Sequence, residues 1–507
     1  MILLDTTIVT VAIPAMVGGL GASLNAIVWV VSVYLLAYAV PMLFTGRLGD
    51  RYGPRRVFLA GLFVFTLASL WCGLSGAVET LIVARAAQGL GAALLTPQTL
   101  AFVGHLFQPS ERGAAMGVWA GVAGLATITG PLLGGALVEH LGWQWVFFVN
   151  VPLGSITFVL TWWLVPDWRP GRVRSFDVTG ILLSAAGLFL VVFGVQNGQK
   201  YGWARVIGPI SVFEVIGIGV VLLGLFVFWQ HVTPREPLMP LRVFEDRNFS
   251  AGTFAWATVG FAITGMLLPL VLYLQSVLDL TPFATGLLTA PMAVVTAATG
   301  PFAGRASDKV GGKYLVLSGL VVLAGGLGLV AVQTGRVVEA AALLPALLLC
   351  GFGFGLVLAP MSSLALGGIE PTLMGTASGI FNTARQVGGV LGSAMVGVLL
   401  QARLMVASTV DATAAAALLP EHYRKLLADH VSDAVVSAGG YGVVPVRVTG
   451  FPPDLAARAD VLAAQAVHRG LGEAASQSLL LPVGVLLLGA IAAAAMRRTT
   501  PAMAKTA

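Results

Sequence analysis

The chain has 507 residues, of which 57% are hydrophobic and 10% are charged, and its mean hydropathy is +0.91. A soluble globular protein carries about 25% charged residues, so this composition excludes that class. The net charge of +6 does not indicate a nucleic-acid partner, because the positive side chains are concentrated in a few short loops.

Apolar runs follow one another along nearly the whole chain, joined by short connections rich in charge, Gly or Pro. A helix of about 20 apolar residues is long enough to cross a bilayer, and each run reaches that length. We therefore predict an all-α polytopic membrane protein with fourteen spans. Their expected bounds are 2–20, 28–48, 57–75, 79–104, 114–137, 145–166, 177–197, 208–231, 250–276, 284–304, 314–333, 338–366, 373–401 and 477–496.

The first span contains "LLDTTIVTVAIP" (3–14), where Asp5 is the only charged side chain among the first 46 residues. The fourth span contains Arg85, within "LIVARAAQGLGAALL". An ionisable residue inside a span indicates a functional site and needs a partner. We predict that Asp5 and Arg85 form a pair that breaks when Asp5 takes up a proton. A static ion pair that only fixes helix packing is the alternative.

The loops divide into a basic set and a set with few charges. Those after the even-numbered spans, together with the C-terminal tail, hold seventeen Lys and Arg residues, whereas the opposite short loops hold three, Lys200, Arg205 and Arg336. Positive side chains are retained on the cytoplasmic side of a membrane. We therefore expect a multi-pass protein of the cell inner (cytoplasmic) membrane with both termini cytoplasmic.

One segment on the opposite side is unusually long, residues 402–476. Two stretches in it, 421–436 and 453–472, have helical periodicity, and a Gly/Pro-rich stretch separates them. We expect an extracellular loop whose amphipathic helices lie over the outer face of the bundle. Nothing in this segment has the residue pattern of a catalytic site.

An internal repeat links the two halves of the chain. "GRLGDRYGPRR" begins at Gly46 and "GRASDKVGGKY" begins at Gly304, 258 positions later. A loop repeated in two halves is typical of a duplicated transporter, although two ordinary basic turns are the alternative. We predict an N-terminal six-helix bundle (1–170), two inserted transmembrane helices (171–245) and a C-terminal six-helix bundle (246–507). The matched pairs are Gly46/Gly304, Arg47/Arg305, Asp50/Asp308, Arg51/Lys309 and Gly53/Gly311.

Six stretches, in order along the chain, resemble motifs of the major facilitator superfamily, specifically its 14-helix drug:H+ antiporters of the EmrB/QacA type. This resemblance implies the superfamily fold of two six-helix bundles, here with two inserted central helices. It also implies proton-coupled secondary active efflux of lipophilic drugs or antibiotics. A transporter of another small metabolite or sugar is the alternative. The stretches are 3–14, 46–56, 84–97, 121–137, 143–154 and 375–392.

In "TGPLLGG", Gly130 and Gly134 are four residues apart and lie on one helix face, where small residues let helix backbones approach closely. Pro131 bends the helix, and Gly135 completes the motif. Simple helix packing is one interpretation. The resemblance adds a second, namely that this antiporter motif controls leakage and the direction of exchange.

The loop after the second span carries a cluster that the resemblance assigns to gating. In that interpretation Asp50 makes charge and helix-dipole contacts that lock the outward-facing state, and Asp308 makes the corresponding, weaker contacts in the second half. Topology and solvation alone are the alternative. The predicted gating residues are Gly46, Asp50, Arg51, Gly53, Arg55, Arg56 and Asp308.

Polar side chains within the spans are candidates for the substrate cavity: Gln88, Asn382, Arg385 and Gln386. The last three either hydrogen-bond across the cavity or lock their helix to a neighbour. Since 283–304 and the 373–401 span contain no acidic residue, the cavity should favour neutral, anionic or monovalent cationic lipophiles.

No Walker loop occurs, and the six histidines are scattered, so the sequence predicts neither ATP hydrolysis nor an enzyme. We expect no cofactor and no metal. The expected partners are a small lipophilic substrate, protons and membrane lipids, with no nucleic acid. A monomer is expected, and accessory envelope proteins stay an open alternative. In the resembled family the helix-1 acid follows ten or more apolar residues, whereas four precede Asp5, which would place it near the cytoplasmic surface. We therefore expect the natural chain to begin upstream of Met1.

Overall fold

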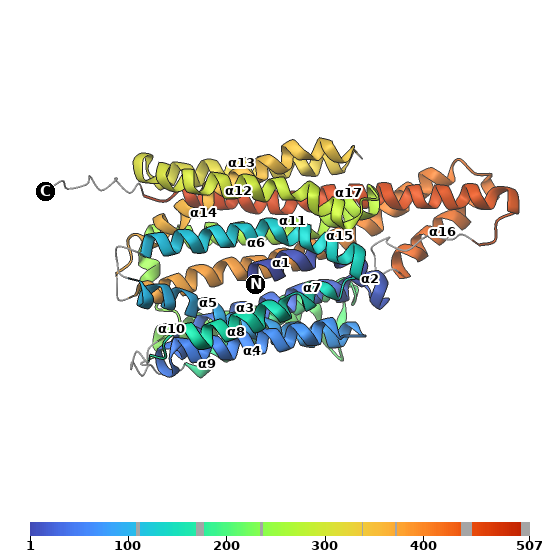
Figure 1. The fold of residues 1–507 in the computed structure, drawn as a ribbon. Helices are drawn as coiled ribbons and strands as arrows, with labels where there is room; N and C mark the ends of the chain where they lie inside the picture. The colour runs from blue at the N-terminus through green and yellow to red at the C-terminus, as the bar shows by residue number, and fades with distance from the viewer. Residues whose placement is uncertain are drawn as a thin grey trace.

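The computed structural model describes residues 1–107, 112–168, 177–233, 237–336, 338–370, 373–437 and 449–497. It is a bundle of long helices that run side by side along one axis (Figure 1). Among the described residues, twelve helices are long and apolar enough to cross a membrane, or thirteen if a bent pair at the N-terminus counts as one span. The chain is therefore a multi-pass membrane protein.

The N-terminal part contains α1 (Ile2–Val11), α2 (Ile13–Leu20), α3 (Leu24–Tyr52), α4 (Pro54–Gly73), α5 (Val78–Leu106), α6 (Arg112–Leu141), α7 (Trp145–Phe148) and α8 (Asn150–Leu164). The middle part contains α9 (Val178–Asn197), the antiparallel strands β1 (Arg205–Ile207) and β2 (Ile210–Ser211), and α10 (Val212–Val232). The C-terminal part contains η1 (Leu241–Glu245), α11 (Arg247–Leu272), the π-helical η2 (Tyr273–Val277), α12 (Pro282–Val310), α13 (Gly312–Thr334), η3 (Ala340–Leu343), α14 (Leu344–Leu366), α15 (Met374–Ala416), α16 (Glu421–Ser437) and α17 (Pro453–Ala494).

Several helices begin at a residue whose side chain caps the first turn. Ser23, Asp177 and Thr281 each accept a hydrogen bond from the backbone N–H three residues later. Such a cap satisfies one of the N–H groups that have no partner inside the helix. Glu214 and Ser211 form a reciprocal capping box at the start of α10, so this acid has a structural role.

The first predicted span, 2–20, is not one straight helix. The axes of α1 and α2 differ by 63°. Pro14 lies in the first turn of α2, and a proline there cannot donate the hydrogen bond that would continue α1. The span predicted at 145–166 is also divided, because the short helix α7 precedes α8.

The repeated loops take the same backbone conformation in the two halves. Gly53 joins α3 to α4 with φ 93° and ψ 131°, and Gly311 joins α12 to α13 with φ 90° and ψ 136°. Only glycine adopts these angles readily, which explains why both loops keep it. The glycine at the start of each loop also has a matching environment: a Cβ at Gly46 would meet Pro97 of α5 at 3.8 Å, and one at Gly304 would meet Ala359 of α14 at 3.7 Å.

A second matched pair of contacts was not predicted from the sequence. A Cβ on Gly61 of α4 would lie 3.0 Å from the Gly91 carbonyl oxygen of α5. In the other half, a Cβ on Gly319 of α13 would lie 2.9 Å from the Gly353 carbonyl oxygen of α14. Gly319 follows Gly61 by the same 258 positions that separate the loops. Close backbone contact through small residues is how membrane helices associate, so both halves use the same packing.

Helices α9 and α10 pack on each other and form the middle pair. Asp177 at the start of α9 accepts hydrogen bonds from Trp229 (2.8 Å) and Gln230 (2.7 Å) of α10, which fixes the two helices at that end. Helix α9 also contacts α3 and α15, one helix from each half. The pair therefore lies against the junction of the two halves.

Residues 402–476 contain the two predicted helices, since α16 spans Glu421–Ser437 and α17 begins at Pro453, but they are not placed as expected. Helix α15 continues without a break to Ala416, and α17 begins at Pro453. Together with α16 these extensions form an arm that projects from one end of the bundle instead of lying over it (Figure 1). We call this end the arm end. The opposite end, where Gly53 joins α3 to α4, is called the basic end.

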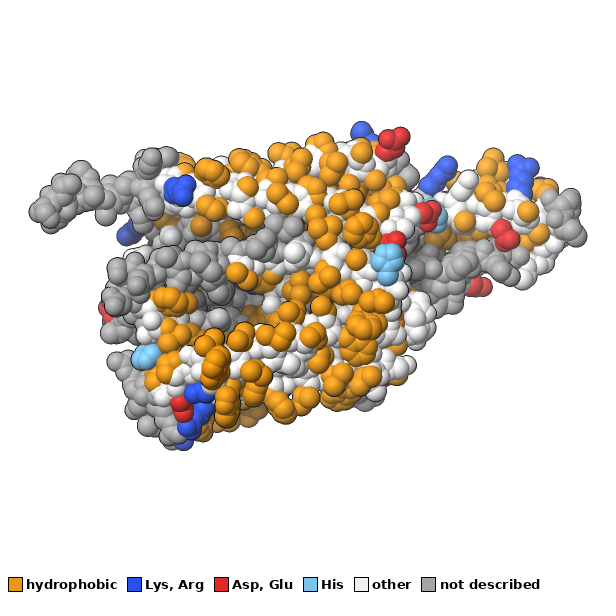
Figure 2. All heavy atoms as spheres, in the orientation of Figure 1, with side chains coloured by type: hydrophobic (Ala, Val, Ile, Leu, Met, Phe, Trp, Pro, Cys, Tyr) orange, Lys and Arg blue, Asp and Glu red, His pale blue; other side chains and the backbone are white. Residues whose placement is uncertain are grey.

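Apolar side chains cover the visible face of the bundle, and charged side chains gather toward its ends (Figure 2). The exposed apolar residues include Phe63, Trp163 and Phe228. This distribution is what a bilayer requires, since lipid surrounds the middle of a spanning protein. The chain's N-terminus lies about half-way along the bundle (Figure 1), and Asp5 is fully buried. The sequence had suggested a position near the cytoplasmic surface, and the structure does not place Asp5 at either end of the bundle.

Candidate functional site

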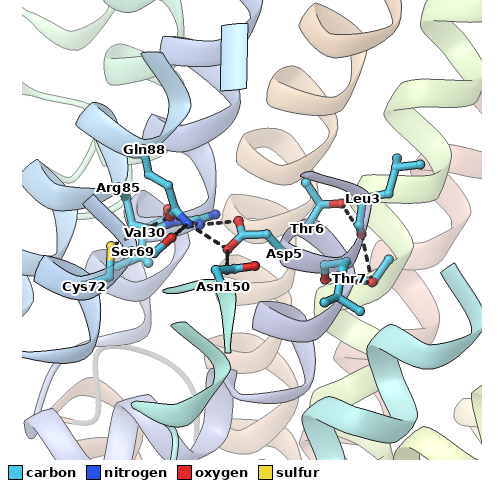
Figure 3. A network of polar contacts seen from close by, with 11 residues as sticks. Leu3, Asp5, Thr6, Thr7, Val30, Ser69, Cys72, Arg85, Gln88 and Asn150 are labelled. Carbon is cyan, nitrogen blue, oxygen red and sulfur yellow. Dashed lines mark hydrogen bonds and ion pairs between the residues drawn. The ribbon is translucent and has the colours of Figure 1, made fainter. Parts of the chain in front are cut away.

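The predicted ion pair between Asp5 and Arg85 is present at the centre of a buried polar cluster (Figure 3). Arg85 Nη1 donates to Asp5 Oδ2 at 2.6 Å. The two side chains are 1% and 0% exposed. Helix α1 supplies the acid and α5 the base, so the pair joins the first helix of the bundle to a helix 80 positions further along the chain.

Three neutral polar side chains complete this cluster. Gln88 lies one turn after Arg85, donates to Asp5 Oδ1 (2.9 Å) and accepts from Arg85 Nη1 (2.6 Å). Asn150, the first residue of α8, donates to the same Asp5 Oδ1 at 2.9 Å. Ser69 of α4 accepts a hydrogen bond from the Gln88 amide at 2.6 Å. Helices α1, α5 and α8 therefore meet at one carboxylate, and α4 joins the cluster through Gln88.

Arg85 has partners other than Asp5. Its Nε donates to the Val30 carbonyl oxygen of α3 at 3.2 Å. Its guanidinium carbon lies 3.9 Å from the centre of the Tyr34 ring, and the Phe147 ring is 5.7 Å away. Aromatic faces attract a cation, and more strongly where water is excluded. The guanidinium is therefore held by α3 and α7 as well as by Asp5.

The two oxygens of Asp5 differ in their surroundings. Oδ1 accepts two amide N–H groups, whereas the only hydrogen bond to Oδ2 among the described residues comes from Arg85. The two amide hydrogen bonds to Oδ1 do not depend on Arg85, and Arg85 has Gln88, Val30 and Tyr34 as further partners.

The glycines of "TGPLLGG" hold α6 against two other helices. A Cβ at Gly134 would lie 2.6 Å from Ile8 Cγ1, and Gly130 packs against Thr7, so both glycines face α1, the helix that carries Asp5. On another side, a Cβ at Gly135 would lie 2.5 Å from the Pro282 carbonyl oxygen of α12. Gly286 of α12 in turn packs on the Pro131 carbonyl. The motif thus connects α1 to the C-terminal half.

The predicted gating residues are found at the basic end. Arg55 donates to the Trp162 carbonyl and lies over the Trp162 ring at 5.4 Å, and Arg56 pairs with Asp167 at 2.6 Å. Arg51 lies over the Tyr52 ring at 5.4 Å. The side chains of Asp50 and Asp308 are outside the described part of the structure, so their predicted contacts are not described.

The four cavity candidates separate into different environments. Gln88 is fully buried in the Asp5 cluster and does not line a cavity. Asn382 donates to the Ser378 carbonyl of its own helix at 2.9 Å. Gln386 is 6% exposed. Arg385 stays partly accessible, with its guanidinium 5.8 Å from the centre of the Trp256 ring of α11.

Two cavities among those lined by described residues lie beside the middle pair. The larger, of about 710 Å³, opens near the arm end between α3, α5, α9 and α15, and Trp29, Phe189 and Phe193 line it. These three rings lie 5.9–6.2 Å apart. The smaller, of about 410 Å³, lies between the middle pair and α11 and α15. Helix α9 or α10 contributes to each cavity.

Sequence reasoning did not identify Asn150, Ser69 or Tyr34. Asn150 lies within the quoted stretch 143–154, where its position as a lone amide in an apolar run was the available signal. Ser69 and Tyr34 carry no comparable signal, because such residues are common in spans. Within the part of the chain that the structure describes, no group of three His, Cys, Asp or Glu residues could hold a metal ion.

A helical bundle with matched halves, a buried charge pair and apolar outer faces defines a polytopic membrane transporter. The chain belongs to the Major Facilitator Superfamily, whose family model matches residues 1–393. It is a transporter and not an enzyme. A crystal structure of a bacterial homolog to the human lysosomal transporter Spinster has the same fold, with a TM-score of 0.63, 14% identity, and 99% of this chain and 96% of that chain covered.

Relatives of known name are also transporters. An uncharacterized MFS-type transporter of Mycobacterium tuberculosis is 40% identical over 97% of this chain and 78% of its own length. The multidrug resistance protein Stp of the same species is 34% identical, with 88% of this chain and 82% of Stp covered. The tetracenomycin C resistance and export protein of Streptomyces glaucescens is 35% identical, with 80% and 74% covered.

Proposed function

We propose that the protein exports lipophilic drugs or antibiotics across the cytoplasmic membrane in exchange for protons. The observation that carries this proposal is the buried Asp5–Arg85 pair, which offers a carboxylate that can bind and release a proton inside the membrane. Relatives named for multidrug resistance and for tetracenomycin C resistance and export support the direction and the cargo. The aromatic lining of the 710 Å³ cavity suits an apolar, drug-sized molecule.

In this mechanism Asp5 alternates between two states. Ionised, it holds Arg85 and ties α1 to α5. Protonated, it releases Arg85 to its other partners, so that α1 is held to α5 and α8 only by the amide hydrogen bonds from Gln88 and Asn150 and can move more easily. Because Gly130 and Gly134 pack α6 on α1 while Gly135 packs α6 on α12, a shift of α1 reaches the junction of the halves. The driving force is sufficient, since one charge moving through 100 mV supplies about 2.3 kcal/mol.

The proposal includes an orientation and a span count. Fourteen spans result if the α1–α2 pair and α6 are added to the twelve helices that qualify by length and composition. An even count puts both termini on one side, and the excess of Lys and Arg at the basic end favours the cytoplasm. The arm would then project outside the cell. The loop around Asp50 and Gly53 would act as the cytoplasmic gate.

Transport in everted membrane vesicles tests the proposal. A panel of fluorescent lipophilic dyes is followed together with a pH-sensitive dye, and a protonophore serves as the control for the driving force. We expect dye accumulation that depends on the proton gradient, and we expect Asp5→Asn to abolish it. Asp429→Asn, at an exposed position of α16, is the matched control and should transport normally.

Asp5→Asn leaves Arg85 buried without its counter-ion, so folding must be measured in parallel. The double variant Asp5→Asn/Arg85→Gln removes both charges and should recover a monodisperse elution profile in detergent. If that double variant folds and still shows gradient-driven dye accumulation, the coupling role of Asp5 is wrong. Gradient-driven uptake of sugars or small metabolites, with no dye transport, would instead favour the alternative cargo.

A further inference from the structure

Three charged side chains lie deep among the spans: Asp5, Arg85 and Arg385. In the described helices every other Lys, Arg, Asp or Glu lies within five residues of a helix end or in the arm, 402–476. Asp5 and Arg85 neutralise each other. Away from the helix ends, the described bundle therefore carries one positive charge without a described carboxylate partner, on Arg385.

Arg385 makes no ion pair with any described carboxylate. Tyr38 of α3 is the ionisable side chain near enough to interact with it electrostatically, and the Trp256 ring lies beside it at 5.8 Å. A charge at membrane depth is costly unless it is paired, and such residues usually mark a substrate or ion pathway. An arginine in this position needs an anion that the described chain does not supply.

Hydrogen-bond donors without a partner surround the same crossing of α11 and α15. The indole Nε1 of Trp256 and the hydroxyls of Thr253 and Thr383 are buried and have no partner in the structure. These three side chains are 6–7% exposed. Buried polar groups are nearly always hydrogen-bonded, so each unpaired one requires an explanation. An oxyanion would satisfy the indole N–H and the guanidinium together.

Apolar space adjoins these donors. Thr253 and Thr383 line the 410 Å³ cavity. Trp256 and Arg385 do not line it, although the residues that follow Trp256 and precede Arg385 in the chain, Ala257 and Ala384, do. The rest of its lining is mostly aliphatic and aromatic, from Leu188, Leu223, Phe226 and Phe254 among others. A molecule with an apolar body and one acidic group matches this combination.

The position of Arg385 is fixed by close packing. Gly260 of α11 lies against the Arg385 backbone carbonyl, and Gly388 lies against the Ala257 carbonyl, so neither glycine has room for a side chain. Trp256 also stacks on Phe381, with ring centres 5.5 Å apart. The donors are therefore held in place before any ligand arrives, which reduces the entropy cost of binding.

From this geometry we infer that Arg385 and Trp256 form a recognition site for a lipophilic anion, such as an aromatic carboxylate or phenolate, at the junction of α3, α11 and α15. This inference rests on the proposed function, because it names the class of cargo that the exporter takes. It narrows the expectation from the sequence, which left neutral, anionic and monovalent cationic lipophiles open.

Three pyrene probes with the same ring test this site: 4-(1-pyrenyl)butyrate, its methyl ester, and 4-(1-pyrenyl)butyltrimethylammonium. Binding to the purified full-length protein in detergent is measured by fluorescence anisotropy at pH 7, where the butyrate is ionised. We expect the butyrate to bind at least tenfold more tightly than the ester, because a hydrogen bond to a charged group contributes about 1.5–3 kcal/mol. The cation should bind most weakly.

Arg385→Gln should remove the preference for the butyrate and leave the ester affinity unchanged. Arg385→Lys should retain part of it, since an ammonium keeps the charge but not the planar fork. Trp256→Phe keeps the stacked ring, removes the N–H donor and should reduce butyrate affinity severalfold. Arg403→Gln, an exposed position on the same helix, is the matched control and should behave as the unmodified protein.

The inference is wrong if Arg385→Gln weakens all three probes equally, since that result assigns Arg385 to helix packing. It is also wrong if the unmodified protein binds the cation as tightly as the butyrate. Proteoliposomes with an imposed pH gradient separate this question from the proposed function. If gradient-driven transport of the ester survives Arg385→Gln, the proposed export function stands whatever the butyrate result. If no probe shows gradient-driven transport, the proposed export function is wrong, and the binding data still decide whether the anion site exists.

Discussion

The two deep arginines of this transporter have opposite environments. Arg85 is 1% exposed, forms an ion pair with Asp5 and contacts Gln88, Val30 and Tyr34. Arg385 is partly accessible and has no described acid partner. Tyr34 and Tyr38, one turn apart on α3 with ring centres 6.1 Å apart, lie between them. The charge of Arg85 is therefore neutralised within the chain, whereas the charge of Arg385 is available to a ligand.

Removing each arginine should give the largest contrast. Arg85→Gln strands the buried Asp5 carboxylate and should lower stability by about 3–5 kcal/mol. Arg385→Gln removes a cation that has no acid partner and should cost nothing measurable. Thermal unfolding in detergent, followed by tryptophan fluorescence, compares the two. Equal losses for both variants would show that the two arginines do not differ as the structure indicates.

A second test disturbs the packing of α1, the helix that carries Asp5, and leaves the surroundings of Arg385 unchanged. Gly134→Ala places a Cβ 2.6 Å from Ile8 Cγ1 and 3.1 Å from the Ile8 carbonyl oxygen, so α1 must move away from α6. Overpacking of this kind costs about 1–3 kcal/mol. Gly217→Ala on α10, where nothing lies within 4 Å, is the control. We expect Gly134→Ala to reduce gradient-driven dye transport and to leave pyrenebutyrate binding unchanged; loss of that binding would mean that the two regions are coupled in the resting protein.

A smaller effect is expected at Tyr34. Its ring faces Arg85 at 3.9 Å, while its buried hydroxyl has no partner. Tyr34→Phe keeps the ring and should preserve both stability and transport. Tyr34→Leu removes the cation–π contact and should cost about 1–2 kcal/mol. The same unfolding assay measures both variants, and a larger loss for Phe than for Leu would show that the hydroxyl, not the ring, supports the arginine.

The smallest effect is expected at Asp177, which lies near neither of the two deep arginines. Burial alone would raise the pKa of this carboxyl, but hydrogen bonds from Gln230, the Gly180 N–H and Trp229 hold its pKa below the usual 3.8. A lowered pKa in the folded state contributes stability above about pH 4 that is lost as pH falls through the folded-state pKa. Asp177→Asn keeps an N-cap acceptor but removes the charge, so it should lower the unfolding temperature slightly at pH 7 and less at pH 3. A difference that grows toward low pH would contradict this sign.

The helices and the Asp5–Arg85 pair were predictable because the signals are local. Each span is a largely apolar run, Asp5 is the only charge in the first, and Arg85 is the only charge of the fourth apart from Glu79 at its end, so pairing Asp5 with Arg85 lowers the burial cost of both. The repeated loop predicted a duplication, and Gly53 and Gly311 of the two loops have nearly equal backbone angles.

Other features depend on distant contacts and were not predictable. The periodicity of 421–436 and 453–472 indicates helices but not their direction, so the projecting arm was missed. Gln88 was assigned to a cavity because its sequence neighbourhood does not show that Asp5 lies opposite. The absence of an acid near Arg385 is likewise a property of the packed helices, not of 375–392.

The glycine contacts shared by the two halves have a mechanical consequence. Where backbones touch, as at Gly61 with Gly91 and at Gly319 with Gly353, no flexible side chain separates the helices and can absorb displacement. The three helices α3, α4 and α5 should therefore move as one rigid body, and α12, α13 and α14 as another. A displacement that begins at the Asp5 carboxylate would then be transmitted to the far ends of both groups of helices with little loss of amplitude.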